Sequence, residues 1–170
     1  MQSQIIGSGK VVELSYQLFD ESHNHQMIEQ MTAEYPLQFL FGSGKMLPAF
    51  EFELEGLPAG AVFDFELDAT RAYGAYQDDK LKQIFADELA QNENYPFDLM
   101  QIGDRLQLLL DGEKYTGIVS LKTDQYFILD QNHFLAGKSL RFRGTVLFVR
   151  QAREQELIEG RYIPSDGLRF

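Results

Sequence analysis

The amino-acid sequence predicts an α+β protein that is mainly β, with an antiparallel sheet packed on one short helix and a small inserted lobe. Three patterns support this prediction. Apolar and polar residues alternate over residues 10–19, 61–67 and 140–150, as they do in half-buried strands. One short helical segment begins at Pro48. Residues 79–129 then form a separate stretch that has its own helix and hairpin signals.

The first half of the chain supplies the short early strands of this sheet. Residues 10–19 form a strand, residues 20–25 a polar turn, and residues 37–41 a second, shorter strand closed by a Gly-Ser-Gly sequence. One face of the first strand carries Val12, Leu14, Tyr16 and Leu18.

The short helix is expected to start at Pro48, because proline fits the first helical turn, where its missing N–H costs nothing. It presents Phe50 and Leu54 on one face and ends at Gly56. The strand over residues 61–67 follows, and we expect its inward face to belong to the core. That face carries Phe63, Phe65 and Leu67.

The middle of the chain has a different character. Residues 79–90 place apolar side chains at helical spacing and predict a helix, whose apolar face would form the core of the inserted lobe: Leu81, Ile84, Phe85 and Leu89. Asp111-Gly112 between two apolar runs predicts a hairpin. Residues 126–129 are expected to form a third strand of this lobe.

The last long strand is predicted over residues 140–150. One face of this strand carries Leu140, Phe142, Gly144, Val146 and Phe148, and we expect Phe148 to belong to the core. One or two helical turns over residues 153–159 follow, and the chain from Arg161 onward resembles a loose tail.

Composition excludes several classes of function. The formal net charge of −11 disfavours nucleic acid and anionic membranes as partners, because like charges repel. The sequence has no cysteine, which removes disulfides and thiol chemistry. Three scattered histidines make a weak case for a metal site. Neither a signal peptide nor a run of roughly 20 apolar residues is present, so we expect a cytoplasmic protein.

Three segments carry a family resemblance. Residues 36–51 (PLQFLFGSGKMLPAFE), 72–76 (AYGAY) and 132–142 (NHFLAGKSLRF) occur in the order and with the long gap typical of FKBP-type prolyl isomerases of the SlyD kind. The resemblance covers roughly residues 5–160. It implies an FKBP sheet curled over the short helix, with an insert-in-flap lobe spliced above the active site.

The resemblance also implies a division of labour. Residues 1–76 and 132–155 would form the isomerase domain, residues 77–131 the insert-in-flap chaperone domain, and residues 156–170 a C-terminal tail. Isomerisation of X–Pro bonds would occur in the first and capture of unfolded chains in the second, without a cofactor and in a monomer. SlyD-type proteins often end in a nickel-binding tail rich in histidine and cysteine, which this chain lacks, so we expect no metal.

Family positions identify the walls of the cleft. Tyr73 matches the tyrosine whose hydroxyl bonds the substrate carbonyl, and Glu29 stands where these proteins usually have aspartate, with Asp20 as a rival. Met46 and Leu47 match aliphatic residues whose backbone meets the peptide. The complete expected set is Tyr16, Glu29, Phe39, Met46, Leu47, Phe50, Tyr73 and Phe142.

The inserted lobe has more aromatic residues than about 55 residues can hide comfortably. Some of them are expected to form an exposed apolar surface that binds unfolded chains: Tyr95, Phe97, Tyr115, Tyr126 and Phe127. A holdase with little or no isomerase activity is the alternative function.

Overall fold

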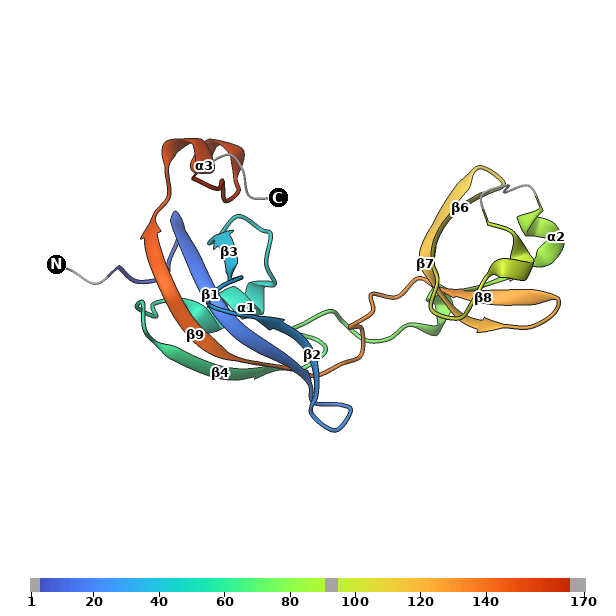
Figure 1. Ribbon diagram of the computed structural model, residues 1–170, viewed down its shortest axis with the longest axis horizontal. Coiled ribbons are helices and arrows are strands. Elements are labelled where there is room, and N and C mark those ends of the chain that lie inside the picture. Colours follow the sequence, from blue (N-terminus) through green and yellow to red (C-terminus); the bar gives the residue numbers. More distant parts are fainter. Residues whose placement is uncertain (1–3, 91–94, 166–170) are drawn as a thin grey trace. The chain divides into compact units, whose positions relative to one another are not determined.

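The computed structural model describes residues 4–90 and 95–165 (Figure 1). The chain divides into two compact units. The first unit contains the chain up to Gly74 and from Gly137 onward, and the inserted unit contains Ala75–Ala136. Both units are built on antiparallel sheets with few helices, so the predicted fold class is confirmed.

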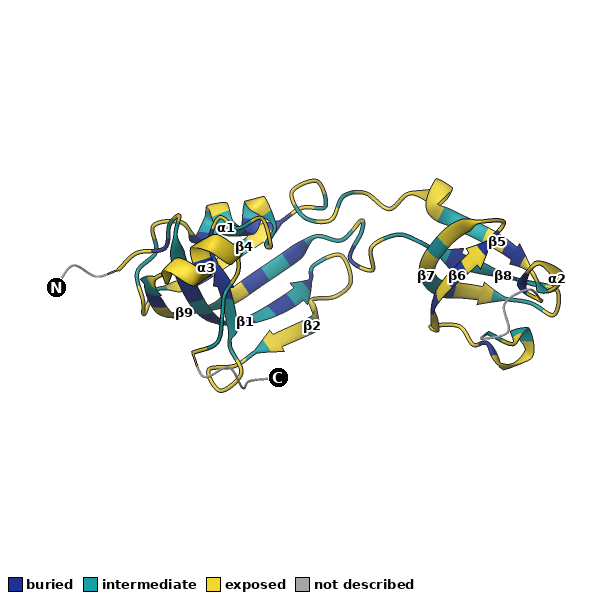
Figure 2. Cartoon of the chain, turned by 90° about the horizontal axis from the view of Figure 1, so that it is seen from above, coloured by how far each residue is buried: buried dark blue, intermediate teal, exposed yellow. Residues whose placement is uncertain are grey.

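The sheet of the first unit is organised around its longest early strand. In order, the strands are β2 (Gln26–Met31), β1 (Lys10–Asp20), β9 (Leu140–Gln151) and β4 (Val62–Leu67), and β3 (Leu37–Leu40) pairs with β1. Burial alternates along most of β1, as its sequence predicts (Figure 2). Strand β2 has no counterpart among the sequence predictions.

Helix α1 (Pro48–Leu54) begins and ends as predicted. Proline occupies the first turn, and Phe50 and Leu54 are buried. Beyond the helix end Gly56 has a φ of 84°, a left-handed conformation that glycine adopts without steric cost. Proline at its start and glycine beyond its end therefore limit α1 to a short helix, and this helix buries Phe50 in the first unit.

A bulge in β9 overturns one core prediction. Leu14 pairs with Val146 but Glu13 pairs with Phe148, so Leu147 is an extra residue. The extra residue reverses the alternation, and Phe148 is 52% exposed rather than in the core. The prediction for Phe148 is wrong because a period-two pattern does not anticipate a bulge.

Gly144 in β9 permits a close approach of neighbouring residues. A Cβ atom built there would lie 2.1 Å from the Ser15 carbonyl oxygen, 2.7 Å from Tyr16 Cβ and 2.8 Å from Phe63 Cζ. Any larger residue would push these groups apart, so glycine allows Tyr16 and Phe63 to pack on the same face of the sheet.

The chain after β9 is held in place, contrary to the expected loose tail. Helix α3 (Glu154–Glu159) buries Glu156, which accepts two hydrogen bonds of 2.7 Å from the Arg150 guanidinium. Glu156 also accepts the backbone N–H of Ile163 at 3.1 Å. Tyr162 packs on the cluster of Val11, Leu40 and Ala152. The residues up to Ile163 are thus anchored to the first unit.

The inserted unit is a four-stranded sheet with short helical segments. Its strand order is β5 (Leu81–Phe85), β8 (Tyr126–Asp130), β7 (Glu113–Lys122) and β6 (Arg105–Leu110). Its helical segments are η1 (Asp78–Lys80), α2 (Ala86–Leu89) and η2 (Phe97–Leu99). The β6–β7 hairpin is confirmed, with positive φ at Asp111 and Gly112 as its turn requires.

The long helix predicted over residues 79–90 is wrong. Residues 81–85 pair with β8 along their whole length, residues 78–80 form the 3₁₀ turn η1, and α-helix is confined to residues 86–89. Ile84 and Leu89 enter the core, whereas Phe85 is 44% exposed. Short apolar runs fit either periodicity, and here the available sheet edge at β8 decides the outcome.

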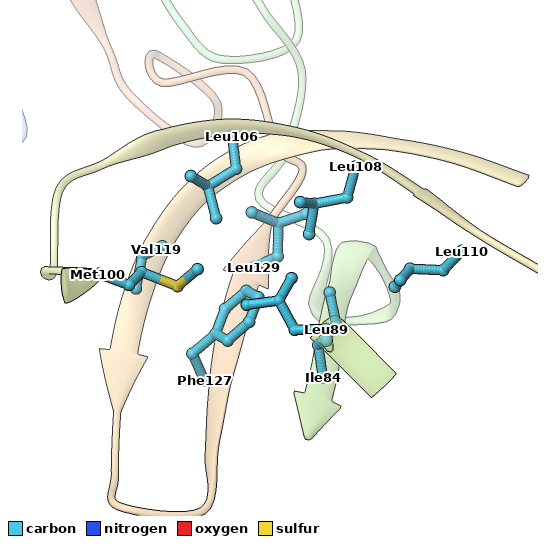
Figure 3. Packing of buried hydrophobic residues seen from close by; sticks show 9 residues of the cluster. All are labelled: Ile84, Leu89, Met100, Leu106, Leu108, Leu110, Val119, Phe127 and Leu129. Carbon is cyan, nitrogen blue, oxygen red and sulfur yellow. The ribbon is translucent and has the colours of Figure 1, made fainter. Parts of the chain in front are cut away.

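Nine buried side chains converge to form the core of the inserted unit (Figure 3). They are Ile84, Leu89, Met100, Leu106, Leu108, Leu110, Val119, Phe127 and Leu129. Phe127 is completely buried. The expectation that Phe127 contributes to an exposed binding surface is therefore wrong.

Candidate active site

An aromatic cluster lies where α1 faces the sheet of the first unit. The Phe50 ring is its centre, with its centroid 4.9 Å from that of Phe142 and 6.2 Å from that of Phe39. Tyr16 joins at 6.3 Å from Phe50 and 5.8 Å from Phe142. Four of the predicted cleft residues, from β1, β3, α1 and β9, therefore meet in one place.

Glu29 on β2 contacts this cluster through Tyr16. The buried Tyr16 hydroxyl donates a hydrogen bond to Glu29 Oε1. Burial, followed by this bond and the nearby carboxylate charge, raises the pKa of Tyr16 well above its ordinary value of 10.0. The Tyr16 hydroxyl is therefore neutral, and its hydrogen bond to the Glu29 carboxylate sets its orientation.

Tyr73 lies at the edge of the same region. It is 38% exposed, and burial followed by the charge of Glu29 raises the pKa of its hydroxyl. The charges of Tyr73 and Glu29 also affect Tyr16, so the three groups are electrostatic neighbours. Met46 and Leu47 are half-buried, and Leu47 directly precedes α1 as its N-cap residue.

Similarity to known proteins identifies the family. The family model described as FKBP-type peptidyl-prolyl cis-trans isomerase matches residues 2–101. The chain is 30% identical over 150 residues to the FKBP-type peptidyl-prolyl cis-trans isomerase SlyD of Escherichia coli (strain K12). The matched segment covers 88% of this chain and 73% of that protein. The chain belongs to the FKBP-type peptidyl-prolyl cis-trans isomerases of the SlyD kind. The SlyD protein of Vibrio cholerae serotype O1 is 31% identical over 163 residues, covering 95% of this chain and 77% of the relative.

The rival acidic residue of this FKBP-type chain has other hydrogen-bond partners. Asp20 is only 2% exposed and accepts hydrogen bonds from Lys138 and from the Ser22 backbone N–H. Burial opposes ionisation of Asp20, but these bonds outweigh it and lower its pKa. Asp20 joins the end of β1 to the segment before β9, while Glu29 is the carboxylate bonded to Tyr16.

Phe65 belongs to the aromatic cluster, although its sequence pattern assigned it to the core. Its ring centroid lies 5.5 Å from Phe142, 5.9 Å from Phe50 and 5.8 Å from Phe63. Phe63 is buried as predicted, whereas Phe65 is only half-buried. The pairing of Phe65 with Phe142 across β4 and β9 is the signal that would have found it, and it requires the strand register.

The remaining predicted aromatics of the inserted unit are half-buried. Tyr95, Phe97 and Tyr115 pack against the unit's core, and Tyr126 contacts Phe85 with 5.7 Å between ring centroids. The most exposed apolar side chains of this unit are aliphatic: Leu99, Ile102 and Leu109 at 76%, 66% and 62%. Sequence reasoning missed these residues because it looked only for aromatics.

Residues 4–90 and 95–165 contain no group of three or more His, Cys, Asp or Glu side chains placed to hold a metal ion. Over those same residues, none of the helices has the length and apolar character needed to cross a bilayer.

Proposed function

We propose that the aromatic cluster catalyses cis–trans isomerisation of Xaa–Pro bonds in unfolded polypeptides and that the inserted unit binds those polypeptides. The observation that carries the catalytic part is the convergence of Tyr16, Phe39, Phe50 and Phe142 beside Glu29 and Tyr73. The family membership supports the same reaction.

The reaction needs no covalent step. Amide resonance sets a barrier of about 18–20 kcal/mol, and uncatalysed exchange takes tens to hundreds of seconds. The transition state is a twisted amide that has lost its resonance, so each 1.4 kcal/mol of selective stabilisation accelerates exchange about tenfold. An apolar cleft that holds the proline ring stabilises the planar, more polar amide less well than the twisted one.

Named residues divide this work. Phe50 forms the floor of the cleft, and Tyr16, Phe39 and Phe142 form its walls. The Tyr73 hydroxyl donates to the substrate carbonyl, and the backbone at Met46 and Leu47 meets the peptide. Glu29 orients the Tyr16 hydroxyl, which lies in the same cluster. Proline-containing unfolded chains in the cytoplasm are the proposed substrates, acted on by a monomer that uses no cofactor.

The inserted unit is proposed to be the insert-in-flap chaperone domain, corresponding to residues 77–131. Supporting this role, Leu99 and Ile102 are exposed, and Tyr95 and Leu99 line a cavity of about 100 Å³. Because the unit is joined to the first unit through both of its ends, a captured chain would have a raised effective concentration at the catalytic cluster.

Replacing residues 78–131 with a short loop tests both parts. This design keeps the two hydrogen bonds between Gln77 and Asn132, at 2.9 and 3.0 Å, which join the ends of the excised segment. The shortened protein should isomerise short peptides as the full chain does, but should accelerate proline-limited protein refolding far less. Equal refolding activity would contradict the role of the insert.

The exposed aliphatic residues of the insert favour a second candidate, a holdase without useful catalysis. A refolding assay with the protein at about a tenth of the substrate concentration or less separates the two functions. A catalyst acts on many substrate molecules in turn, whereas a holdase is needed in roughly equal amounts to its substrate. Leu99→Ser with Ile102→Ser should weaken refolding activity in the catalytic case. Ile158→Ser, an equally exposed site on α3 in the first unit, is the matched control.

A further inference from the structure

A cavity of about 550 Å³ on the first unit has no part in the aromatic cluster. It lies between the β2–β3 connection and the segment that follows α3, and we call it the Tyr35 groove. Its lining includes Met31, Glu34, Tyr35, Pro36, Tyr162 and Pro164. Two tyrosines and two prolines from distant parts of the sequence thus face one space.

The wall of the groove after α3 is fixed in place by contacts within the chain. Tyr162 packs on the Val11 cluster, and the Arg150 guanidinium lies 6.0 Å from the centroid of its ring. The backbone N–H of Ile163 is bonded to buried Glu156, and the Ile163 carbonyl accepts a hydrogen bond from Arg153. The buried Glu156 network therefore holds a preformed binding wall, and preformed sites lose less entropy on binding.

The opposite wall continues into the catalytic cluster. Met31 is the Cα partner of Tyr16 across β1 and β2. Glu29, which binds the Tyr16 hydroxyl, lies two residues before Met31 and so points to the same side of the strand. Two residues along a strand span roughly 7 Å. A polypeptide held at Tyr16 can therefore reach the groove within a few residues.

The chemistry of the lining selects a kind of ligand. Tyrosine and proline faces bind extended, proline-containing peptides, and tyrosine rings also stack on guanidinium groups. Glu34 is acidic, none of the residues described as lining the groove is basic, and the whole chain carries a formal charge of −11. Charge complementarity favours lysine or arginine in the ligand.

We propose that the Tyr35 groove binds a basic, proline-containing segment of the substrate, beside the Xaa–Pro bond that occupies the aromatic cluster. This inference rests on the proposed function, since it extends the same substrate along the same unit. It makes the enzyme selective for proline bonds that have basic neighbours.

Fluorescence anisotropy with three labelled peptides tests this proposal. Each peptide carries one Leu-Pro bond, alone, beside a Pro-Lys-Pro-Arg stretch, or beside a Pro-Glu-Pro-Glu stretch. The basic peptide should bind most tightly, and less so at high salt. Tyr35→Ala should weaken its binding about tenfold, since truncated tyrosines often have effects of this size. Glu34→Lys should weaken it roughly threefold, as expected for an exposed charge.

Matched controls exist on α1 and at its end. Phe52→Ala removes an aromatic ring that is 72% exposed, like Tyr35 at 73%, and Glu55→Lys makes the same charge change as Glu34→Lys. Neither should alter binding of the basic peptide. Equal losses in controls and groove variants, or equal affinity for the basic and acidic peptides, would overturn the proposal.

Other occupants of the groove have distinct signatures, each of which would overturn the proposal. A second copy would appear as self-association abolished by Tyr35→Ala. If peptides bound only after residues 166–170 were removed, the groove would serve the chain's own end. Wild-type isomerisation of the short peptide is measured separately. If the wild-type protein did not isomerise the short peptide but still bound the basic peptide selectively, the proposed function would be refuted. The proposed binding of basic peptides by the groove would still stand.

Discussion

The hydrogen bond between Tyr16 and Glu29 allows a quantitative test of the cleft. The hydroxyl belongs to a residue that is 6% exposed, whereas Glu29 is exposed. Glu29→Leu leaves a buried donor without its acceptor, which costs about 1–3 kcal/mol. Tyr16→Phe removes the donor and lets water hydrate the carboxylate, which costs about 1 kcal/mol. The double variant leaves no buried hydroxyl, so its loss should be about 1 kcal/mol smaller than the sum of the single losses.

Urea unfolding of the four proteins in this cycle measures the coupling directly. Both residues contact one another, so additivity is not expected. If the two losses added to within about 0.3–0.5 kcal/mol, the spread usual for independent sites, the bond would contribute nothing and the reasoning would be refuted.

The same variants report on catalysis. If the orientation of Tyr16 by this bond stabilises the transition state by about 1.4 kcal/mol, Glu29→Leu should lower kcat/KM for a short proline peptide about tenfold. Glu29→Asp keeps the charge, shortens the side chain by one methylene and should fall between wild type and Glu29→Leu. Unchanged kcat/KM in a destabilised Glu29→Leu variant would assign Glu29 a structural role only.

Three further predictions concern other parts of the first unit. Gly144→Ala should destabilise the protein by about 3 kcal/mol through overpacking, because its Cβ would lie 2.1 Å from a carbonyl oxygen; Gly7→Ala, with open space around it, is the control in the same denaturation assay. Tyr73→Phe should lower kcat/KM about tenfold with little change in stability, whereas Phe142→Ala, which removes a buried ring, should also cost about 3–5 kcal/mol of stability in urea unfolding. Hydrogen bonds from Arg150 and Arg153 outweigh burial and lower the pKa of Glu156 below its ordinary 4.5. The stability that ionised Glu156 contributes is therefore present above pH 4.5 and lost as the pH falls further. Glu156→Gln should cost about 3 kcal/mol of stability at neutral pH and reduce this acid-induced loss, as measured by unfolding at several pH values.

Local signals predicted the parts of the fold that depend on local physics. Alternation along β1, proline at the start of α1 and the Asp111-Gly112 turn each act within a few residues, and each prediction is confirmed. The edge strand β2 was not predicted because its burial does not alternate, which leaves little periodic signal in its sequence.

The errors arise where a distant partner decides the structure. The pairing of β5 with β8 overrides helical spacing over residues 81–85. One extra residue opposite β1 exposes Phe148. Phe65 joins the cluster because β4 pairs with β9 in a register that places it opposite Phe142. Family positions identified Phe50 and three of the four rings around it, but not Phe65, which the resemblance does not mark.

The position of β9 has a consequence for the protein's own biogenesis. This strand lies between β1 and β4, so the sheet of the first unit lacks its centre until Leu140–Gln151 has left the ribosome. Leu18 is synthesised early, but its cross-strand partner Phe142 is synthesised more than a hundred residues later. The inserted unit has a complete sheet and core of its own and can fold during that interval. We expect vectorial synthesis to reverse the order of appearance: the unit that begins first finishes last.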